Sequence, residues 1–325
     1  MIARRTLLRT GAPLVALVLL AGLAAGCEEA TGEESGWEGG EAPLDVVATM
    51  TIVGDLAEQI GGDAVDVDVV VPVGADPHTF EPRPSDAETV EGADFLVSNG
   101  AGLEERWLND MLARSDGTHV ALAEGIDPRT FEEGEDAGEP DPHLWNDPVL
   151  VRDGYVPALV DALAEALPDD EVEGLSERAE AYTAELDALD AWAAEAVATI
   201  PAEQRKLVTT HDAFGYFGQR YGVDVVGTLY GVSTETEPSP AEVTGLVEAI
   251  RDEVVVAVFV ETLTSPELME RVADEAGVEL GEDLLGDSVG EEEGTDTYVG
   301  MMRANISAIV EGLGGEPPAW EGASR

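Results

Sequence analysis

Cysteine, lysine and histidine are scarce in this sequence, and the scarcity narrows what the chain can be. Among 325 residues there is one cysteine, Cys27, and one lysine, Lys206, and there are four histidines. A single cysteine excludes a disulfide within the chain. The 16 lysines and arginines face 69 aspartates and glutamates, which gives a formal net charge of −53. Because such a chain repels phosphate groups, nucleic acid is excluded as a partner.

The acidic residues are spread along the whole chain rather than gathered at one place. This distribution is typical of adaptation to high salt, where a carboxylate-rich surface stays hydrated and its self-repulsion is screened. The charge allows a cationic ligand but is not evidence for one. Hydrophobic residues make up 44% of the chain, enough for a substantial core, and the length suffices for two compact domains.

The N-terminal segment has the features of an export signal. Arg4, Arg5 and Arg9 precede the apolar run 14–23, and small residues then lead to Cys27. The run is short for a membrane-spanning helix. The segment resembles a bacterial lipoprotein signal, which implies cleavage before Cys27, lipidation of its thiol and an extracytoplasmic protein anchored to the outer face of the cell membrane. Its arginines leave the export route open between the general and the twin-arginine route.

Six segments are expected along the chain. They are a signal peptide at 1–26, a flexible acidic tether at 27–43, an N-terminal α/β lobe at 44–168, a connecting helix at 169–200, a C-terminal α/β lobe at 201–314 and a tail at 315–325. Strands and helices alternate in both lobes, which is typical of parallel sheets covered by helices. We therefore predict an α/β fold of two similar lobes with parallel sheets flanked by helices, joined by one long rigid helix, with a ligand cleft between the lobes.

Individual elements are predicted from apolar runs, turn residues and helical periodicity. Strands are expected at 44–52, 65–71, 95–98, 119–123, 207–210, 223–229 and 254–260, and helices at 84–92, 104–113, 149–167, 212–221, 238–252, 265–276 and 297–313. The connecting helix carries apolar residues at steps of three and four from Leu175 to Ile200, and Pro201 ends it. Asp169 and Asp170 are expected to cap its start.

Three of the four histidines lie where a sheet could gather a ligand. His78 follows the valine-rich strand 65–71, His211 lies where a strand turns into a helix, and His143 lies just before a helix. Ligands of parallel α/β sheets collect outside the carboxyl ends of the strands, and imidazole is a good ligand for zinc, copper and nickel. The three are far apart in the sequence and match no local metal motif, so capping or surface roles stay open. His119 is expected to be a strand-edge residue.

The phrases around these histidines carry a resemblance. They are GADPHTFEPRPSD at 74–86, DPHLWNDP at 141–148 and HDAFGYFGQRYG at 211–222, followed by DTYVGMMRANISAIVEGL at 296–313. In this order, over nearly the whole mature chain, they resemble the metal-receptor lipoproteins of ABC importers for zinc and manganese. The resemblance implies two metal ligands in the N-terminal lobe, His78 and His143, and a third, His211, in the C-terminal lobe. The fourth ligand of the family is a carboxylate in a loop before the last helix, and Asp287 is the expected residue.

The ligand set also bears on the metal. Members of this family that are associated with manganese tend to carry Glu at the third position, where this chain has His211. Three imidazoles and one carboxylate suit zinc. The resemblance thus implies a monomeric solute-binding protein, not an enzyme, that carries a divalent metal, with Zn²⁺ expected and Mn²⁺ as the alternative. It delivers the ion to the permease and ATPase of an ABC importer.

The chain departs from the family in one loop. Zinc receptors often carry a histidine-rich loop before the second ligand, whereas the loop 131–141 is acidic here.

Three alternative functions stay open. They are a manganese or iron receptor, a zinc hydrolase in which water replaces Asp287, and an adhesin on the same fold. Carboxylates that lie near the imidazoles in the sequence could orient them, namely Asp76, Glu81, Asp147 and Asp212.

Overall fold

The computed structural model describes residues 42–131, 137–232, 234 and 236–323. The expected signal peptide, Cys27 and most of the tether lie outside this part of the chain. From Ala42 onward the residues form one compact unit. Within the described residues, no helix has the length and apolar character needed to cross a membrane.

The N-terminal lobe is built on a sheet of four parallel strands in the order β2-β1-β3-β4. The strands are β1 (Leu44–Met50), β2 (Val65–Val71), β3 (Phe95–Ser98) and β4 (Thr118–Ala121). The central strand β3 is buried at every residue, because helices cover the sheet. These helices include α1 (Thr51–Gly61), α2 (Pro84–Gly92) and α3 (Glu105–Leu112).

The C-terminal lobe repeats this arrangement with shorter strands. Its strands are β5 (Lys206–Thr209), β6 (Asp224–Thr228), β7 (Ala257–Val258) and β8 (Glu279–Leu280). The pairs β5–β6 and β7–β8 are parallel, and a backbone hydrogen bond from Phe259 N to Val208 O (2.9 Å) joins them. The spatial order is therefore β6-β5-β7-β8, the same chain order as in the first lobe. The prediction of an α/β fold with two similar lobes is confirmed.

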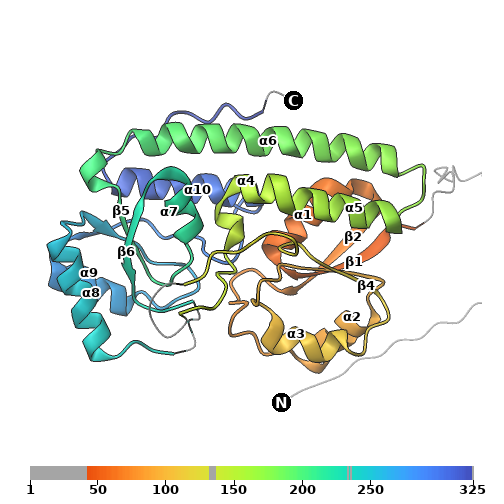
Figure 1. Cartoon of the computed structure of the whole chain (residues 1–325), viewed down its shortest axis with the longest axis horizontal. Helices are drawn as coiled ribbons and strands as arrows, with labels where there is room; N and C mark the ends of the chain where they lie inside the picture. The colour runs from red at the N-terminus through yellow and green to blue at the C-terminus, as the bar shows by residue number, and fades with distance from the viewer. Residues whose placement is uncertain (1–41, 132–136, 233, 235, 324–325) are drawn as a thin grey trace, which may run out of the picture. The chain divides into compact units, whose positions relative to one another are not determined.

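The remaining helices surround the two sheets (Figure 1). They are α4 (Pro148–Leu150), a π-helical turn (Val151–Tyr155), α5 (Val156–Ala166), α6 (Val172–Ala198), α7 (Gly215–Tyr221), α8 (Pro240–Asp252), α9 (Glu267–Ala276) and α10 (Tyr298–Gly312), with single 3₁₀ turns at Gly62–Ala64, Leu144–Asn146 and Ala202–Gln204. Figure 1 shows α6 running beside α5 and α1 at one end and beside α10 at the other.

The long helix α6 has 27 residues and is about 40 Å long. Its predicted apolar stripe from Leu175 to Ile200 is buried throughout, against α1 and α5 on one lobe and α7 and α10 on the other. The predicted cap is wrong. The helix begins at Val172 after Glu171, and no side chain caps it, so Asp169 and Asp170 lie before its first turn.

Other boundaries differ where an apolar run fits two structures. The expected strand 44–52 ends at Met50, and α1, which was not predicted, begins at Thr51. A run that is buried on every side reads alike in a central strand and in a buried helix. The expected strand 254–260 pairs with β8 only at Ala257 and Val258, and the two-residue β8 carries no apolar pattern that would have predicted it.

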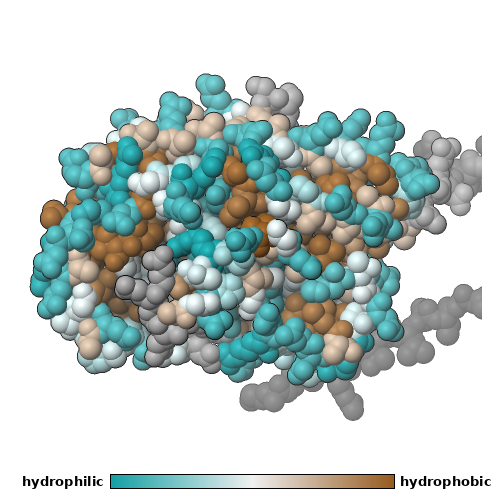
Figure 2. Space-filling model, in the orientation of Figure 1, coloured by the Kyte–Doolittle hydropathy of each residue, from teal (hydrophilic) through white to brown (hydrophobic). Residues whose placement is uncertain are grey.

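One large apolar core joins the two lobes. It runs from the strands and α1 of the first lobe through α6 to α10 and to Phe214 and Phe217 of α7. A second, smaller cluster lies under α8 and α9 in the C-terminal lobe. Figure 2 shows hydrophilic side chains over most of one face with apolar patches between them, in keeping with the acidic composition.

Candidate metal centre

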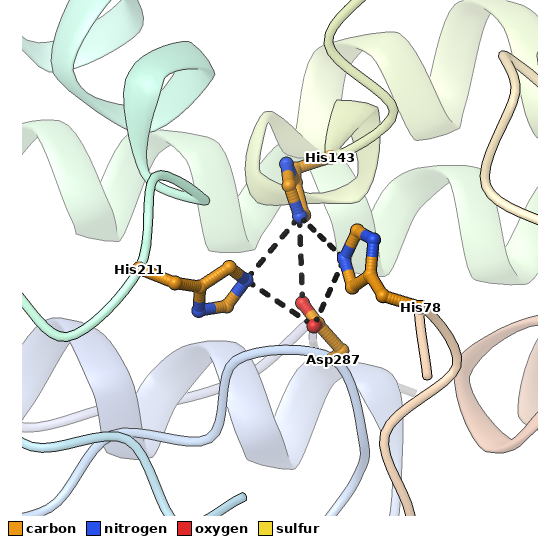
Figure 3. A group of neighbouring side chains, drawn as sticks. All are labelled: His78, His143, His211 and Asp287. Atoms are coloured by element: carbon orange, nitrogen blue, oxygen red, sulfur yellow. Dashed lines mark hydrogen bonds and ion pairs between the residues drawn. The ribbon is translucent and has the colours of Figure 1, made fainter. Parts of the chain in front are cut away.

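Four side chains from distant segments meet between the lobes (Figure 3). His78 lies in the loop after β2, and His143 directly precedes the 3₁₀ turn Leu144–Asn146. His211 follows β5, and Asp287 lies in the loop between β8 and α10. The structure thus brings together the four residues that the sequence analysis selected.

The distances between the inward-facing atoms resemble the edges of a tetrahedron. His143 Nε2 lies 3.2 Å from His78 Nε2 and 3.3 Å from His211 Nε2. Asp287 Oδ2 lies 3.3 Å from His78 Nε2 and 3.2 Å from His211 Nε2, and Oδ1 lies 3.7 Å from His143 Nε2. Ligands about 2.0–2.1 Å from a tetrahedral ion are about 3.3–3.4 Å apart. All four ligand atoms lie within 4.8 Å of one another.

The cluster is buried and incompletely satisfied. The exposed fractions are 8% for His78, 0% for His143, 2% for His211 and 2% for Asp287. Among the described residues no donor reaches Asp287 Oδ1. A buried carboxylate oxygen without a partner costs free energy, which a cation at the centre would remove.

Two carboxylates orient two of the imidazoles from behind. Asp141 Oδ1 lies 2.8 Å from His143 Nδ1 and accepts the backbone N–H of His143. Glu261 Oε2 lies 2.6 Å from His211 Nδ1, and Glu261 Oε1 accepts the backbone N–H of His211. At His143 the proton held on Nδ1 by Asp141 leaves the lone pair of Nε2 directed to the centre. At His211 the Glu261 carboxylate makes a close ion pair with Nδ1 without hydrogen-bond geometry.

The carboxylates expected in these orienting roles were the wrong ones. Asp76 accepts the backbone N–H of His78 (2.8 Å), and Asp147 caps α4 by accepting from Val149 N. In the described part of the chain neither Glu81 nor Asp212 contacts an imidazole through its carboxylate. Asp141 lies nearer to His143 in the sequence than Asp147 does, so proximity would have found it, whereas Glu261 comes from a distant segment of the chain. The available signals were the Asp of the Asp-Pro-His phrase and a glutamate just after a buried strand, which is the position of Glu261.

The loop that carries Asp287 is held by the N-terminal lobe. Trp145 Nε1, two residues after His143, donates to Gly286 O (3.2 Å). Val289 N donates to Thr51 Oγ1 at the start of α1 (3.1 Å). The position of the C-terminal carboxylate is therefore set in part by the N-terminal lobe.

The charges around the site favour a cation. Asp141, Glu261 and Asp287 supply three negative charges, and Arg129, whose Nη1 lies 3.0 Å from Asp141 Oδ2, supplies one positive charge. The carboxyl of Asp212 is also close enough to interact with Asp141, His143 and His211. Buried negative charge without compensation is costly, so a cation at the centre is stabilised.

Ionisation of the site without metal follows the same electrostatics. Burial by itself lowers the pKa of His211, but the carboxylates of Glu261 and Asp287 outweigh it and hold the pKa well above its usual value. Burial by itself raises the pKa of Asp287, and the neighbouring His211 and His78 hold it well below its usual value. A proton on His211 thus takes part of the role that a metal cation would fill.

His119 stands apart from the cluster, as expected. It lies on β4, and its Nε2 is 2.8 Å from Ser98 Oγ. Burial lowers the pKa of His119. Within the described residues, His119 does not belong to a cluster of histidine and acidic side chains that could hold a metal ion.

An open polar cavity of about 460 Å³ lies between the lobes beside the cluster. Asp76, Thr79 and Glu81 line it from the loop that carries His78, and Tyr230 and Thr264 line it from the C-terminal lobe. The cavity lies between the lobes, where a ligand cleft was expected, but the four clustered side chains do not line it.

Comparison with known proteins places the chain among metal receptors. The model of a family described as "Zinc-uptake complex component A periplasmic" (ZnuA) matches residues 46–312. The manganese-binding lipoprotein MntA of Halalkalibacterium halodurans is 37% identical over 300 residues, which cover 91% of this chain and 96% of that protein. The manganese ABC transporter substrate-binding lipoprotein PsaA of Streptococcus anginosus is 32% identical over 310 residues, covering 92% and 96%.

A solved structure is similar over the same region. The periplasmic zinc-binding protein TroA from Treponema pallidum superimposes with a TM-score of 0.78 at 33% sequence identity, covering 83% of this chain and 99% of that one. The names of these relatives include both zinc and manganese, so similarity supports a metal receptor without choosing the metal.

Proposed function

Because this chain belongs to the family of the periplasmic zinc-uptake component A, it is the substrate-binding component of an ABC metal importer, and we propose that it binds one zinc ion through His78, His143, His211 and Asp287. The observation that carries the proposal is the convergence of four buried ligand atoms from four segments. The family consists of solute-binding proteins, not enzymes, so the bound ion is cargo that is captured and handed to a permease driven by an ATPase.

The donor set supports zinc over manganese. Three imidazole nitrogens and one carboxylate form a set of borderline softness that zinc binds well, whereas manganese favours more oxygen donors. A glutamate at the third position would supply such an oxygen, and this chain has His211 there. The relatives named for manganese keep a manganese receptor as the alternative.

Capture and release follow from the arrangement of the two lobes. The polar cavity beside His78 offers a route to the centre, and its carboxylates attract cations. Asp141 and Glu261 keep two imidazoles ready to bind. Because α6 and the shared core join the lobes, release needs local movement of the ligand loops rather than a wide separation of the lobes.

The proposal includes the location of the protein. The relatives named above as lipoproteins support a chain that is exported, cleaved before Cys27 and anchored by lipid at the outer face of the membrane. A signal peptide at 1–26, a tether at 27–43 and lobes at 44–168 and 201–314 around the connecting helix 169–200 complete this scheme. We expect the protein to act as a monomer.

The test is elemental analysis of the purified chain from Glu28 onward. Protein exposed to equal concentrations of Zn²⁺ and Mn²⁺ and then desalted should retain one zinc per chain. His211→Ala should lose it, whereas His119→Ala, which removes a histidine outside the cluster, should keep it. Manganese in the native protein would favour the alternative receptor. Equal metal content in the three proteins would refute the site.

A further inference from the structure

Arg129 is not a metal ligand, but it contacts the residue that orients one. Its Nη1 donates to Asp141 Oδ2 (3.0 Å), and its backbone carbonyl accepts Asp141 N (2.8 Å). The other oxygen of the same carboxylate lies 2.8 Å from His143 Nδ1. Arg129 therefore holds Asp141 by side chain and backbone, in the position from which Asp141 directs His143.

The same arginine also lies against the opposite lobe. The hydroxyl of Tyr216 on α7 accepts Arg129 N (2.9 Å) and donates to Asp141 O (2.9 Å). The guanidinium carbon lies 5.4 Å from the centre of the Tyr216 ring, a distance at which a cation is attracted to the ring face. The helix α7 begins at Gly215, four residues after the ligand His211.

Gly215 leaves the space that the guanidinium occupies. A methyl group at this position would lie 1.5 Å from Arg129 Nη1 and 2.6 Å from Cζ. The three atoms nearest to that methyl group all belong to Arg129. The contact between Arg129 and α7 thus depends on a bare backbone at the first residue of the helix.

We propose that Arg129 is a positioning residue for metal capture, which ties the carboxylate behind His143 to α7 so that His143 is aimed at the ion when the two lobes are in contact. This inference rests on the proposed function, because it concerns how the same site binds its metal. Through this contact, the position of α7 in the C-terminal lobe affects the orientation of His143 in the N-terminal lobe, in addition to any effect of the metal ligands themselves.

Two variants remove this link in independent ways. Arg129→Met deletes the guanidinium and retains a long side chain. Gly215→Ala leaves Arg129, Asp141 and every ligand unchanged, but its methyl group displaces the guanidinium. The fold tolerates this displacement, because the atoms that must move are the far end of a flexible side chain that is one-third exposed. Loss of a partner behind a metal-binding imidazole typically costs about 10–100-fold in affinity.

The two variants should not be additive if the inference holds. Zinc affinity, measured by competition with a chromophoric chelator, should fall in each single variant by about 3–10-fold, less than for loss of a direct partner, because Asp141 itself remains behind His143. The double variant should match Arg129→Met, since no guanidinium remains for the methyl group to displace. Gly245→Ala in α8, where nothing lies within 4 Å of the new methyl group, is the matched glycine control. Arg114→Met, which removes a surface arginine paired with Glu91, is the arginine control.

A second readout separates positioning from general stability. With four histidines in the chain, the ¹⁵N resonances of labelled histidine can be assigned one by one. Both variants should shift His143 Nδ1 in the metal-free protein and leave those of His119 unchanged. If Gly215→Ala lowers the thermal midpoint of the metal-free protein, the affinity and resonances of Arg129→Met decide the question.

The outcomes distinguish this inference from the function on which it rests. Failure of the unaltered protein to bind zinc would contradict the proposed function. Tight binding by the unaltered protein and equally tight binding by Arg129→Met or Gly215→Ala would overturn the role of Arg129 alone. A double variant whose fold-loss in zinc affinity equals the product of the two single losses would also overturn it, because the two changes would then act separately.

Discussion

The two lobes share a strand order but differ in how they hold their metal ligands. In the N-terminal lobe β1 and β2 each have seven residues and pair along most of their length. In the C-terminal lobe β7 and β8 each have two residues, and a backbone hydrogen bond from Phe259, just after β7, to Val208 on β5 joins the two strand pairs. The first lobe therefore has the longer backbone ladder beneath its loops. The second lobe has a shorter ladder and relies more on buried side chains, although a buried carboxylate holds a ligand in each lobe, Asp141 for His143 and Glu261 for His211.

Asn305 on α10 is the clearest example of such a side chain. Its Oδ1 accepts Leu285 N (2.8 Å), and its Nδ2 donates to Leu285 O (2.7 Å). These are the two bonds that a neighbouring strand would make, and they lie two residues before Asp287. The comparison teaches that repeated topology does not require repeated means of support, provided that the backbone groups find partners.

Among the variants that test this difference between the lobes, Asn305→Leu is expected to have the largest effect on stability. This change leaves both polar groups of Leu285 without partners in a buried loop, and each such group costs about 1–3 kcal/mol. We expect the free energy of unfolding of the metal-free protein to fall by roughly 2–4 kcal/mol in urea titrations. Zinc affinity should fall as well, since the loop positions Asp287.

Asn305→Asp is a second variant for this prediction. It keeps the acceptor for Leu285 N but loses the donor to Leu285 O and buries a charge at a position that is 2% exposed, so its loss of stability should be large at neutral pH and smaller at low pH, where the carboxyl is protonated. An Asn305→Leu protein with unchanged stability and affinity would show that the loop is held by the contacts with Trp145 and Thr51 alone.

A smaller effect, dependent on pH, is expected at the junction of the two lobes. Asp55 on α1 accepts Tyr298 N at the start of α10 (2.8 Å), and burial raises its pKa from 3.8 to about 6. The folded state then binds more protons than the unfolded chain between these two values. The contribution of Asp55 to the free energy of unfolding therefore falls as pH rises from 4 to 6, by up to about 3 kcal/mol.

Asp55→Asn tests this contribution directly. Asparagine can still accept Tyr298 N and has no charge to bury near Glu58 and Asp296, the acids that face the carboxyl. Relative to the unaltered protein, the variant should gain stability between pH 4 and pH 7. Urea titrations at the two pH values that give a constant difference between the proteins would contradict an ionised Asp55 with a raised pKa.

The smallest effect is expected at Ser239, far from the junction. Its Oγ accepts Glu242 N (3.3 Å), and the Glu242 carboxylate accepts Ser239 N, a capping box that starts α8. Ser239→Ala should cost about 1 kcal/mol. Because α8 packs on the separate smaller core, zinc affinity should not change. A loss of affinity in this variant would show that the outer part of the C-terminal lobe is coupled to the site.

Much of the fold could be read from local pattern. The strands 65–71 and 95–98 and the helix 84–92 lie at the predicted residues, since each is bounded by glycine, proline or a change in polarity. Predictions failed where the pattern was ambiguous, as at the passage from β1 to α1. They also failed where an element is very short, as for β8, because its pairing depends on partners from elsewhere in the chain.

The metal centre was likewise predicted in part from the sequence and missed in part. His78, His143, His211 and Asp287 were selected from phrases in the sequence, and the structure brings them together. The carboxylates behind the imidazoles were mistaken for two different reasons. Asp141 was passed over although it lies two residues from His143, whereas Glu261 is distant in the sequence. Glu261 reaches His211 from across fifty residues of chain.

The sequence by itself determined the alternation of strands and helices, the acidic surface and the residue types able to bind a divalent ion, because these depend on periodicity, composition and the chemistry of single side chains. The tertiary structure decided which groups face one another. Orientation of His143 by Asp141 and Arg129, of His211 by Glu261, and of Asp287 by contacts from both lobes needs distances of about 3 Å between segments far apart in the chain. Such distances arise when the two sheets are packed on one shared core.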